Sequence, residues 1–388
     1  MSFCHSCGTK SDHHPIDRTP VIRIAPALSD LKISMCSNCL LIQTCDYPTD
    51  PNELDKVNTS LGITFNTGLD RATQKFKSLQ HLINLDQQSA VVDIGGGAGI
   101  FTELLRSHGI QSLNYEPFAS VKISDLDLNN FLKEFKGNSV ILTFFHVIEH
   151  VPNVVFWLKN LLDIFQKINN RVTYTVVIEC PVLELETPFS QDPTPYWAAF
   201  HVSHFTIGTL ERTCERAGLR LINDFCFDDY NGYLGVFEIV RDTKNQPQSK
   251  SLELDYEMPL VNSYIFHRNQ SLKRYKSRLL QKLQFFDSVC FWGAGIGLDY
   301  FKVNLGTIFQ NLNVQVVDSS EERVSTGENI MNPHEFFKTP AHTLNNCLII
   351  PTSYAKSREI VQQASELIAA SQITSLFEIF PYPHVRAY

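Results

Sequence analysis

The feature that most constrains the fold is the stretch SAVVDIGGGAGIFTELLRSHG at residues 89–109. An apolar run typical of a buried strand ends in a glycine turn, and an amphipathic helix pattern follows at once. The same alternation continues, with strands expected at 112–117, 138–151 and 171–182 and helices at 154–168 and 207–218. Strands that alternate with helices predict the α/β class, a parallel sheet with helices on both faces.

The turn has the pattern D-x-G-x-G-x-G, formed by Asp93, Gly95, Gly97 and Gly99. Glycines let the backbone approach a bound nucleoside closely and adopt φ > 0. A dinucleotide site favours G-x-G-x-x-G, with the pyrophosphate on the helix N-terminus. Here an acidic residue precedes the turn, which disfavours phosphate and favours a cationic ligand. Glu116, about 20 residues further on, can bind ribose hydroxyls. A glycine turn without a ligand is the alternative.

Two CxxC pairs lie near the N-terminus, Cys4 with Cys7 and Cys36 with Cys39, separated by 28 residues. Each pair lets two thiolates reach one ion from a tight turn, so that together they predict a tetrahedral structural Zn²⁺ site. Disulfides are the less favoured alternative in a cytoplasmic protein. We expect the nearby cysteine and histidines to take no part: Cys45, His5, His13 and His14.

Residues 288–302, SVCFWGAGIGLDYFK, predict a second strand, glycine turn and helix. Further strands are expected at 313–320, 346–353 and 373–381. The turn contains Gly293, Gly295 and Gly297. Asp318 ends the next strand, but Leu298 stands where a dinucleotide site has its third glycine. A nucleotide-type fold reused for packing or for substrate is therefore favoured over an NAD site.

Three domains follow from these patterns: a zinc-binding domain at 1–58, a Rossmann-like domain at 59–248 and a second Rossmann-like α/β domain at 249–388. The polar stretch at 241–251 is the predicted linker between the last two.

Composition limits the function classes. The formal net charge is −8, so that the basic face of a nucleic-acid-binding protein is not expected. No apolar run approaches the roughly 20 residues of a membrane span, and no signal peptide pattern is visible at the N-terminus. Most of the ten cysteines stand singly in apolar segments and are expected to be reduced. The expected compartment is the cytoplasm.

The glycine turn and the acidic residue of NYEP resemble motif I and the second-strand acid of class I S-adenosylmethionine (SAM) methyltransferases. The stretch FHVIEHVPN is similar to the segment of that superfamily that lines the methionine side of SAM. The resemblance implies SAM as the cofactor. It places Asp93, Glu116 and the turn glycines at SAM, together with Phe145 and His146.

Over nearly the full chain, the order of the three domains resembles the three-domain sugar C-methyltransferases. CSNCLLIQ is similar to their second cysteine pair, EHVPN to their H-V-P-D/N stretch, and NGYLGVFEIVR to a G-G-S-L-R-V-like strand. FWGAGIG and CLIIPTS follow their C-terminal domain. The resemblance implies methylation of a dTDP-linked keto-deoxysugar bound between the middle and C-terminal domains.

The stretch AAFHVSHFT at 198–206 occupies the place of that family's Y-H-E-H-L-S-Y-F-S. His201 falls on the last histidine of Y-H-E-H and His204 on the later tyrosine, while His150 matches another active-site histidine of the family. Methylation of a carbon next to a carbonyl needs a base, and an imidazole suits that task. The chain departs from the pattern at three positions: Ala198, Ala199 and Phe200. His201 is the favoured base, ahead of His204. Core packing is the alternative for both, and a metal role is disfavoured.

The leading hypothesis is a SAM-dependent methyltransferase acting on a small molecule, most specifically a sugar nucleotide methylated at carbon. Because the glutamate beside His201 is missing, methylation of oxygen or nitrogen is the alternative. An NAD-dependent oxidoreductase is a further alternative, and a zinc-dependent interaction module is disfavoured by the acidic charge balance. We expect no nucleic-acid or membrane partner. The sequence leaves the substrate and the oligomeric state open.

Overall fold

The structure is a computed structural model that describes residues 2–20, 30–45, 69–83, 85–86, 88–116, 125–185, 197, 201–227, 232–240, 254–326, 329–338, 344–352 and 357–374. The chain divides into two compact units. The first contains Met1–Arg18, Leu31–Glu186 and Ala199–Val261, and the second contains Thr19–Asp30, Thr187–Ala198 and Asn262–Tyr388. The boundaries of the three predicted domains stay a prediction, and the expected linker at 241–251 lies outside the described residues.

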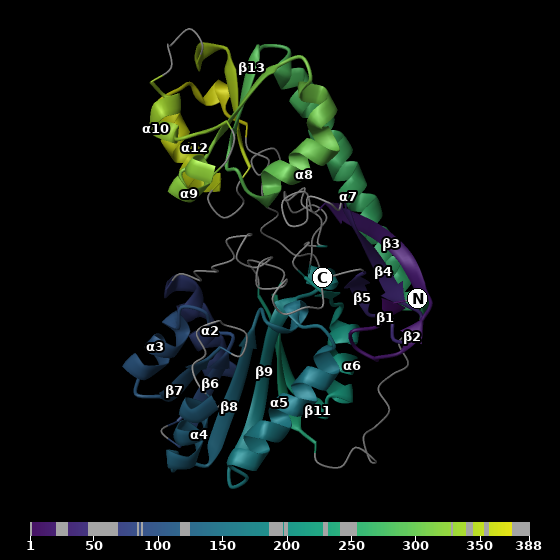
Figure 1. Cartoon of the computed structure of the whole chain (residues 1–388), viewed down its shortest axis with the longest axis vertical. Coiled ribbons are helices and arrows are strands. Elements are labelled where there is room, and N and C mark those ends of the chain that lie inside the picture. The colour runs from purple at the N-terminus through teal and green to yellow at the C-terminus, as the bar shows by residue number, and fades with distance from the viewer. Residues whose placement is uncertain are drawn as a thin grey trace. The chain divides into compact units, whose positions relative to one another are not determined.

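The first unit contains a six-stranded sheet with the order β11-β12-β9-β8-β6-β7 (Figure 1). Its strands are β6 Ser89–Ile94, β7 Gln111–Tyr115, β8 Ser139–Phe145, β9 Thr173–Pro181, β11 Leu219–Cys226 and β12 Gly232–Ile239. The four strands β7, β6, β8 and β9 run parallel, and β12 runs antiparallel to both of its neighbours. The carboxyl ends of the four parallel strands therefore meet at one edge, where ligands bind in sheets of this kind.

Helices cover both faces of this sheet: α2 Leu69–Leu82, α3 Ile100–Ser107, α4 Asp125–Glu134, α5 Val154–Ile168 and α6 Ile207–Arg216. Side chains of a strand point alternately to opposite faces. In β8, Leu142 and Phe144 accordingly join the core under α4, α5 and α6, whereas Ile141 and Phe145 join the core under α2 and α3. Both faces are buried, which explains the nearly continuous apolar run of this strand. The predicted α/β fold class is confirmed.

The N-terminal cysteine segment packs on the same unit. Its strands are β1 Ser2–Phe3, β2 Lys10–Ser11, β3 His13–Pro20, β4 Asp30–Cys36 and β5 Ile42–Thr44. The last three form a four-stranded sheet whose remaining strand is β10, Ser203–His204, paired antiparallel with β5. Cys4, Cys36 and Cys39 lie in the hydrophobic core beneath α5 and α6. The stretch that contains both candidate histidines is thus joined directly to the cysteine segment.

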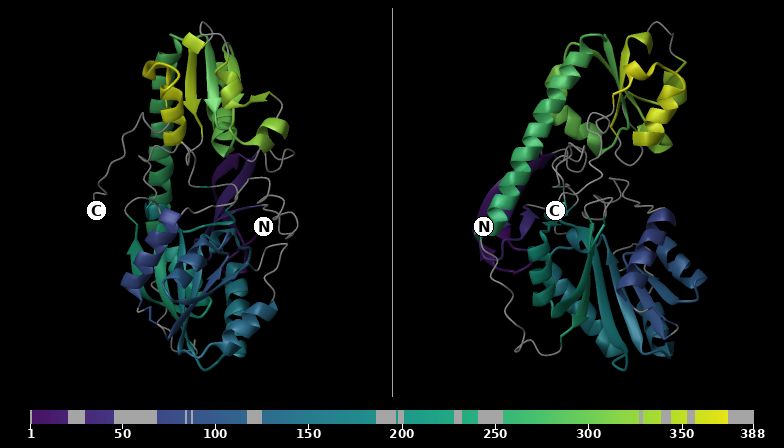
Figure 2. Two further views of the ribbon diagram at one scale, coloured as in Figure 1. Left: turned by 90° about the vertical axis from the view of Figure 1, so that its left-hand side faces the viewer. Right: turned by 180° about the vertical axis from the view of Figure 1, so that it is seen from behind.

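The second unit contains a four-stranded sheet of order β15-β14-β13-β16 in which all pairs are parallel (Figure 2). Its elements are β13 Ser288–Trp292, α8 Ile296–Leu305, β14 Asn313–Val317, α9 Glu321–Thr326, β15 Ile330–Met331, α10 Pro333–Phe336, β16 Cys347–Pro351 and α12 Ser357–Ser365. Helix α7, Leu254–Leu283, has residues in both units. The expected strand at 373–381 lies largely outside the described residues, and its described part is a bridge between Ile373 and Ile349.

Four short 3₁₀ helices complete the described elements: η1 Ile148–His150, η2 Leu183–Leu185, η4 Gly306–Phe309 and η5 Ala370–Gln372. Within the described ranges, no helix combines the length and the apolar character that a membrane crossing requires.

Candidate active site

The glycine turn lies at the carboxyl end of β6 and leads into α3. Gly95, Gly97 and Gly99 all have positive φ angles, of 72°, 55° and 76°. A Cβ atom added at Gly95 would be 2.6 Å from Val147 Cγ2, whereas one added at Gly97 would meet nothing within 4 Å. L-residues with a side chain rarely adopt this backbone conformation. The turn therefore depends on glycine, and Gly97 borders open space that a ligand can occupy.

Gly96 was not singled out by the sequence pattern, although it is the middle of three consecutive glycines. A Cβ atom there would collide with the carboxylate of Asp93 and lie 2.6 Å from Asn114 Oδ1. Asp93 thus lies directly beneath the turn. Its Oδ1 accepts a hydrogen bond of 2.7 Å from the Thr143 hydroxyl of β8.

The Asp93 side chain is buried, with 2% of its residue surface exposed. Burial raises its pKa from 3.8 to about 6, although the Thr143 hydrogen bond and the charge of Lys75 oppose the shift. A carboxylate at this position therefore makes the turn a poor binding site for phosphate.

The raised pKa of Asp93 predicts that the free energy of unfolding depends on pH and that Asp93→Asn removes this contribution. The folded state binds the Asp93 proton more tightly than the unfolded chain does, so that ionisation costs stability as the pH rises through about 6. Between about pH 3 and pH 7, the wild type should lose about 3 kcal/mol of unfolding free energy relative to Asp93→Asn. Denaturant unfolding of both proteins across this range measures the difference. A difference that does not change with pH contradicts the assignment.

Glu116 follows β7 and reaches the same turn. Its Oε1 accepts a hydrogen bond from the Gly97 backbone amide, and the Asn114 side-chain amide donates to the Gly97 carbonyl at 2.9 Å. Burial raises the pKa of Glu116, and the Gly97 hydrogen bond opposes the rise. The structure thus brings three predicted cofactor residues together: Asp93, Gly97 and Glu116.

His146 follows β8 with a left-handed φ of 58°. Its Nδ1 lies 3.1 Å from Glu149 Oε1, and its Nε2 lies 3.1 Å from Glu179 Oε1. Burial alone would lower the pKa of His146, but these two acidic partners raise it to about 9. At neutral pH the ring is a cation that donates to both carboxylates.

Two further cations from α2 surround Glu179. Arg71 lies 3.3 Å from Glu179 Oε1, and Lys75 Nζ lies 4.4 Å from the ring centroid of Phe145. Burial lowers the pKa of Lys75, while the charges of Glu179 and Asp93 oppose that effect. Phe145, predicted at the cofactor, lies in the core against Phe101, with ring centroids 5.1 Å apart.

Sequence reasoning missed this buried ionic cluster of Arg71, Lys75, Glu149 and Glu179 as a functional feature. For Glu179 a signal existed, since a single acidic residue interrupts the apolar strand TVVIECPV. Glu149 stands inside the recognised EHVPN stretch. The two cations of α2 have no comparable signal in the sequence.

His150 and His201 come together from different parts of the first unit. Their ring centroids are 4.9 Å apart with an interplanar angle of 76°. His201 is half-buried, and burial together with the neighbouring imidazoles holds its pKa well below the usual value. The ring is therefore neutral at physiological pH and has an imidazole lone pair available.

The backbone around His201 is fixed from two sides. The Thr44 hydroxyl of β5 donates to the His201 carbonyl at 2.7 Å, and the Val202 amide donates to the Glu149 carbonyl at 2.8 Å. Because the Thr44 hydrogen is used in this way, His204 Nε2 donates to Thr44 Oγ1 at 2.9 Å. His204 is buried, and burial lowers its pKa to about 3. This hydrogen bond indicates that His204 holds β10 against β5. Its predicted catalytic role stays a prediction.

The four predicted zinc ligands Cys4, Cys7, Cys36 and Cys39 place their sulfur atoms within 4.8 Å of one another. The sulfur atoms of Cys4 and Cys39 lie 3.3 Å apart, and those of Cys7 and Cys36 lie 3.8 Å apart. Tetrahedral Zn²⁺ with bonds of about 2.3 Å separates its sulfurs by about 3.8 Å. None of the four cysteines forms a disulfide, and this donor set fits zinc.

Both cysteine turns have the same backbone design. The amide four residues after the first cysteine donates to that cysteine's carbonyl, from Gly8 to Cys4 and from Leu40 to Cys36, each at 2.9 Å. Gly8 and Leu40 both have positive φ angles, of 68° and 62°. The two pairs are thus equivalent turns that aim their sulfurs at one point.

In the second unit, the acidic residue that follows β14 is Asp318, and both of its carboxylate oxygens already accept hydrogen bonds. Asp318 is 4% exposed, and its two oxygens accept from the backbone amides of Ala294 at 2.6 Å and Ser320 at 2.8 Å. A carboxylate that holds ribose hydroxyls must be free to do so. This arrangement disfavours the NAD alternative.

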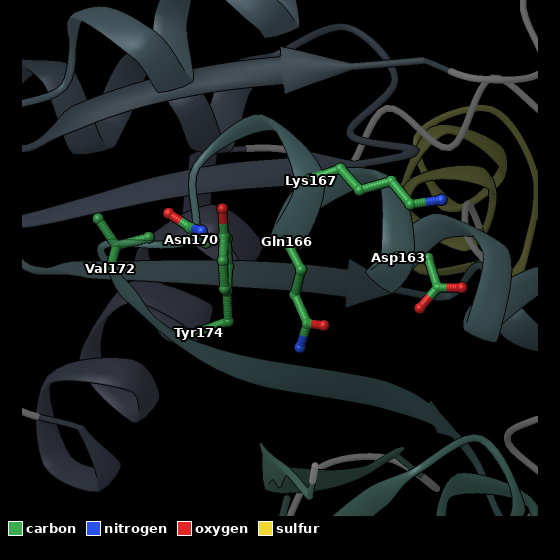
Figure 3. Close-up of a pocket in the computed structure, with 6 residues that line it drawn as sticks. All are labelled: Asp163, Gln166, Lys167, Asn170, Val172 and Tyr174. Atoms are coloured by element: carbon green, nitrogen blue, oxygen red, sulfur yellow. The ribbon is translucent and has the colours of Figure 1, made fainter.

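A surface pocket lies at the opposite end of the first sheet. It is lined by residues of α5, the following loop and the start of β9: Asp163, Gln166, Lys167, Asn170, Val172 and Tyr174 (Figure 3). Ligands of open α/β sheets bind at the carboxyl ends of the strands. This pocket is at the amino end of β9, so that it is not our candidate site.

The segment that contains the glycine turn matches a known protein family. Residues 69–223 match the family model described as a methyltransferase domain. This segment is similar to methyltransferase domains over two fifths of the chain. It contains α2 to α6, the glycine turn and the three candidate histidines, which supports the predicted enzyme class.

Solved structures with a detectable likeness include mitomycin 7-O-methyltransferase MmcR, at 15% identity over 50% of this chain and 59% of that chain, with a TM-score of 0.31. The pyocyanin biosynthetic protein PhzM has 17% identity over 48% and 64%, with a TM-score of 0.30. CalO1, a methyltransferase in calicheamicin biosynthesis, has 16% identity over 46% and 61%, with a TM-score of 0.29. The chain spans about three fifths of the length of these proteins. No curated protein sequence matches the chain.

Proposed function

We propose that the protein transfers a methyl group from SAM to a small molecule. One observation carries the proposal. In a segment that matches a methyltransferase domain, Asp93 and the glycine turn lie at the carboxyl end of β6, and Glu116 follows β7. His150 follows β8, and its ring lies against that of His201 from the segment just before β10. The residues proposed to bind the cofactor and to accept the proton thus lie near the carboxyl edge of the sheet.

SAM, when bound, supplies an electrophilic methyl group on a sulfonium. The open space at Gly97 supports close approach of the cofactor to the backbone. Glu116, which is only partly buried, is the proposed partner of the ribose hydroxyls. Asp93 keeps negative charge beneath the turn and favours a cation over a phosphate.

His201 is the proposed base. Its neutral imidazole takes a proton from the acceptor atom, and the electron pair left on that atom forms the new bond to the methyl carbon as the methyl–sulfur bond breaks. The glutamate expected beside His201 is absent from the sequence, but Glu149 brings a carboxylate oxygen within 4.8 Å of the His150 and His201 nitrogens. A carboxylate near the histidine pair is therefore supplied from η1.

The proposed acceptor is a nucleotide-linked keto-deoxysugar methylated at carbon. Support comes from the order of the zinc, methyltransferase and second α/β segments and from the match of His150 and His201 to the sugar C-methyltransferase pattern. The departures at 198–200, which lie outside the described residues, keep methylation of oxygen or nitrogen as the second candidate.

The test incubates the protein with SAM and a dTDP-4-keto sugar in deuterated water. Carbon methylation predicts a methylated sugar and deuterium exchange at the carbon next to the carbonyl. Exchange that persists at the wild-type rate in His201→Ala rules out His201 as the base. A wild-type protein that neither exchanges this proton nor methylates the sugar contradicts the sugar assignment.

The cysteine cluster is proposed to hold one structural Zn²⁺. Four thiolates close the coordination sphere and leave no position for a substrate. The segment is too small to fold on its own core, so that the metal stabilises it and, through Thr44, the position of His201.

A further inference from the structure

A second group of potential metal ligands lies within the candidate active site. A carboxylate oxygen of Glu149 and one ring nitrogen each of His150 and His201 lie within 4.8 Å of one another. Glu149 and His150 are neighbours in η1, and the Val202 amide ties the segment after His201 to the Glu149 carbonyl at 2.8 Å. The backbone therefore holds these three side chains together.

The two carboxylate oxygens of Glu149 have different surroundings. Its side chain is 1% exposed, and Oε1 accepts from His146 Nδ1 at 3.1 Å. Within the described part of the chain, its buried Oε2 has no hydrogen-bond partner. A buried carboxylate oxygen without a partner costs free energy, and such an atom in a folded protein needs an explanation.

We propose that Glu149, His150 and His201 bind a divalent first-row transition metal ion. Two imidazole nitrogens and one carboxylate are a donor set for ions such as Mn²⁺, Fe²⁺, Co²⁺ and Zn²⁺, and they suit Ca²⁺ poorly. A bound cation would give Glu149 Oε2 the electrostatic partner that it lacks among the described residues. His146 holds the other carboxylate oxygen and so orients the ligand, as outer partners of metal sites do.

Three protein ligands leave coordination positions open, in contrast to the closed site of four cysteines. An oxygen of the methyl acceptor, either a hydroxyl or the oxygen of a carbonyl, is the ligand class that fits. This step rests on the proposed function and refines it. The ion and the acceptor proton compete for the lone pair of His201, so the base role proposed above holds for the metal-free protein. With the ion bound, the metal takes over that role as a Lewis acid that promotes loss of the acceptor proton to solvent.

The test titrates the full-length protein, as purified, with Co²⁺ and with Mn²⁺ and follows binding by visible absorption and calorimetry. We expect one ion per chain, with weak visible Co²⁺ bands and without the intense thiolate charge-transfer bands of cobalt bound to cysteine. Glu149→Gln and His150→Gln should weaken binding by at least about tenfold, the smallest loss seen even for an outer partner of a ligand. His334→Gln, at an exposed histidine of the second unit, should bind as the wild type does.

SAM binding and zinc content of the same samples report whether each variant is folded. Absence of a bound ion in the wild type, or equal affinity in the wild type and both ligand variants, overturns the inference. If SAM binds and no ion does, the metal proposal fails while the proposed function stands. If the ion binds and SAM does not, the proposed function fails instead.

Discussion

Cys36→Ser is expected to release the zinc and to cost more stability than any other single substitution considered. Structural zinc sites of this type contribute on the order of 10 kcal/mol to folding, and removal of one thiolate breaks a closed tetrahedral site. Cys36 also lies in the core beneath α5 and α6, so that the loss extends into the methyltransferase domain. Elemental analysis of protein purified without chelator and thermal unfolding measure both effects.

Cys45→Ser is the matched control. Cys45 is a buried cysteine of the same segment, and its sulfur contacts the Ser34 hydroxyl at 2.7 Å instead of the cluster. The Cys45→Ser protein should retain as much zinc as the wild type. Substoichiometric zinc in the wild type that Cys36→Ser does not reduce would show that the cysteines hold no metal.

His201→Ala is expected to reduce methyl transfer by about 10²–10⁴-fold, the range typical of a general base. SAM affinity should stay nearly unchanged, because the glycine turn and Glu116 come from other segments. A structural role alone predicts the opposite pattern, with lower stability and weaker SAM binding. Single-turnover rates and SAM calorimetry on the same protein separate the two.

His204→Ala tests the positioning role argued from the Thr44 hydrogen bond. Because the His204 ring is buried in the strand pair, its loss should lower the stability more than His201→Ala does and turnover less. Equal loss of turnover in both variants, with SAM binding intact, contradicts this division of roles.

The sequence predicts best those features that local backbone chemistry dictates. The glycine turn is one, because three positive φ angles after a strand require glycines at Gly95, Gly97 and Gly99. The cysteine pairs are another, since each CxxC spacing forms its own turn. The second cysteine turn still holds one surprise. Leu40 adopts a positive φ at the position that Gly8 has in the first turn, and the backbone propensity of leucine does not predict this.

Features made by distant segments were not predictable. Pairing of β10 with β5 joins residues about 160 positions apart, and nothing in AAFHVSHFT indicates that Thr44 holds it. The same holds for Lys75, whose helix has no unusual pattern. Glu149 was expected only as part of a motif. Its position beside two histidines depends on the fold, and this explains why sequence reasoning disfavoured a metal role for His201.

Calorimetry with SAM, its demethylated product and NAD tests the central claim most directly. Gly97→Ala is compared with Gly109→Ala, because both glycines have positive φ and both would place a Cβ in open space, but only Gly97 lies in the turn. Both variants should lose about 1–2 kcal/mol of stability. We predict that the wild type and Gly109→Ala bind SAM and its product but not NAD, and that Gly97→Ala binds SAM more weakly. Binding of NAD in place of SAM, or equal SAM affinity in all three proteins, would contradict cofactor binding at this turn.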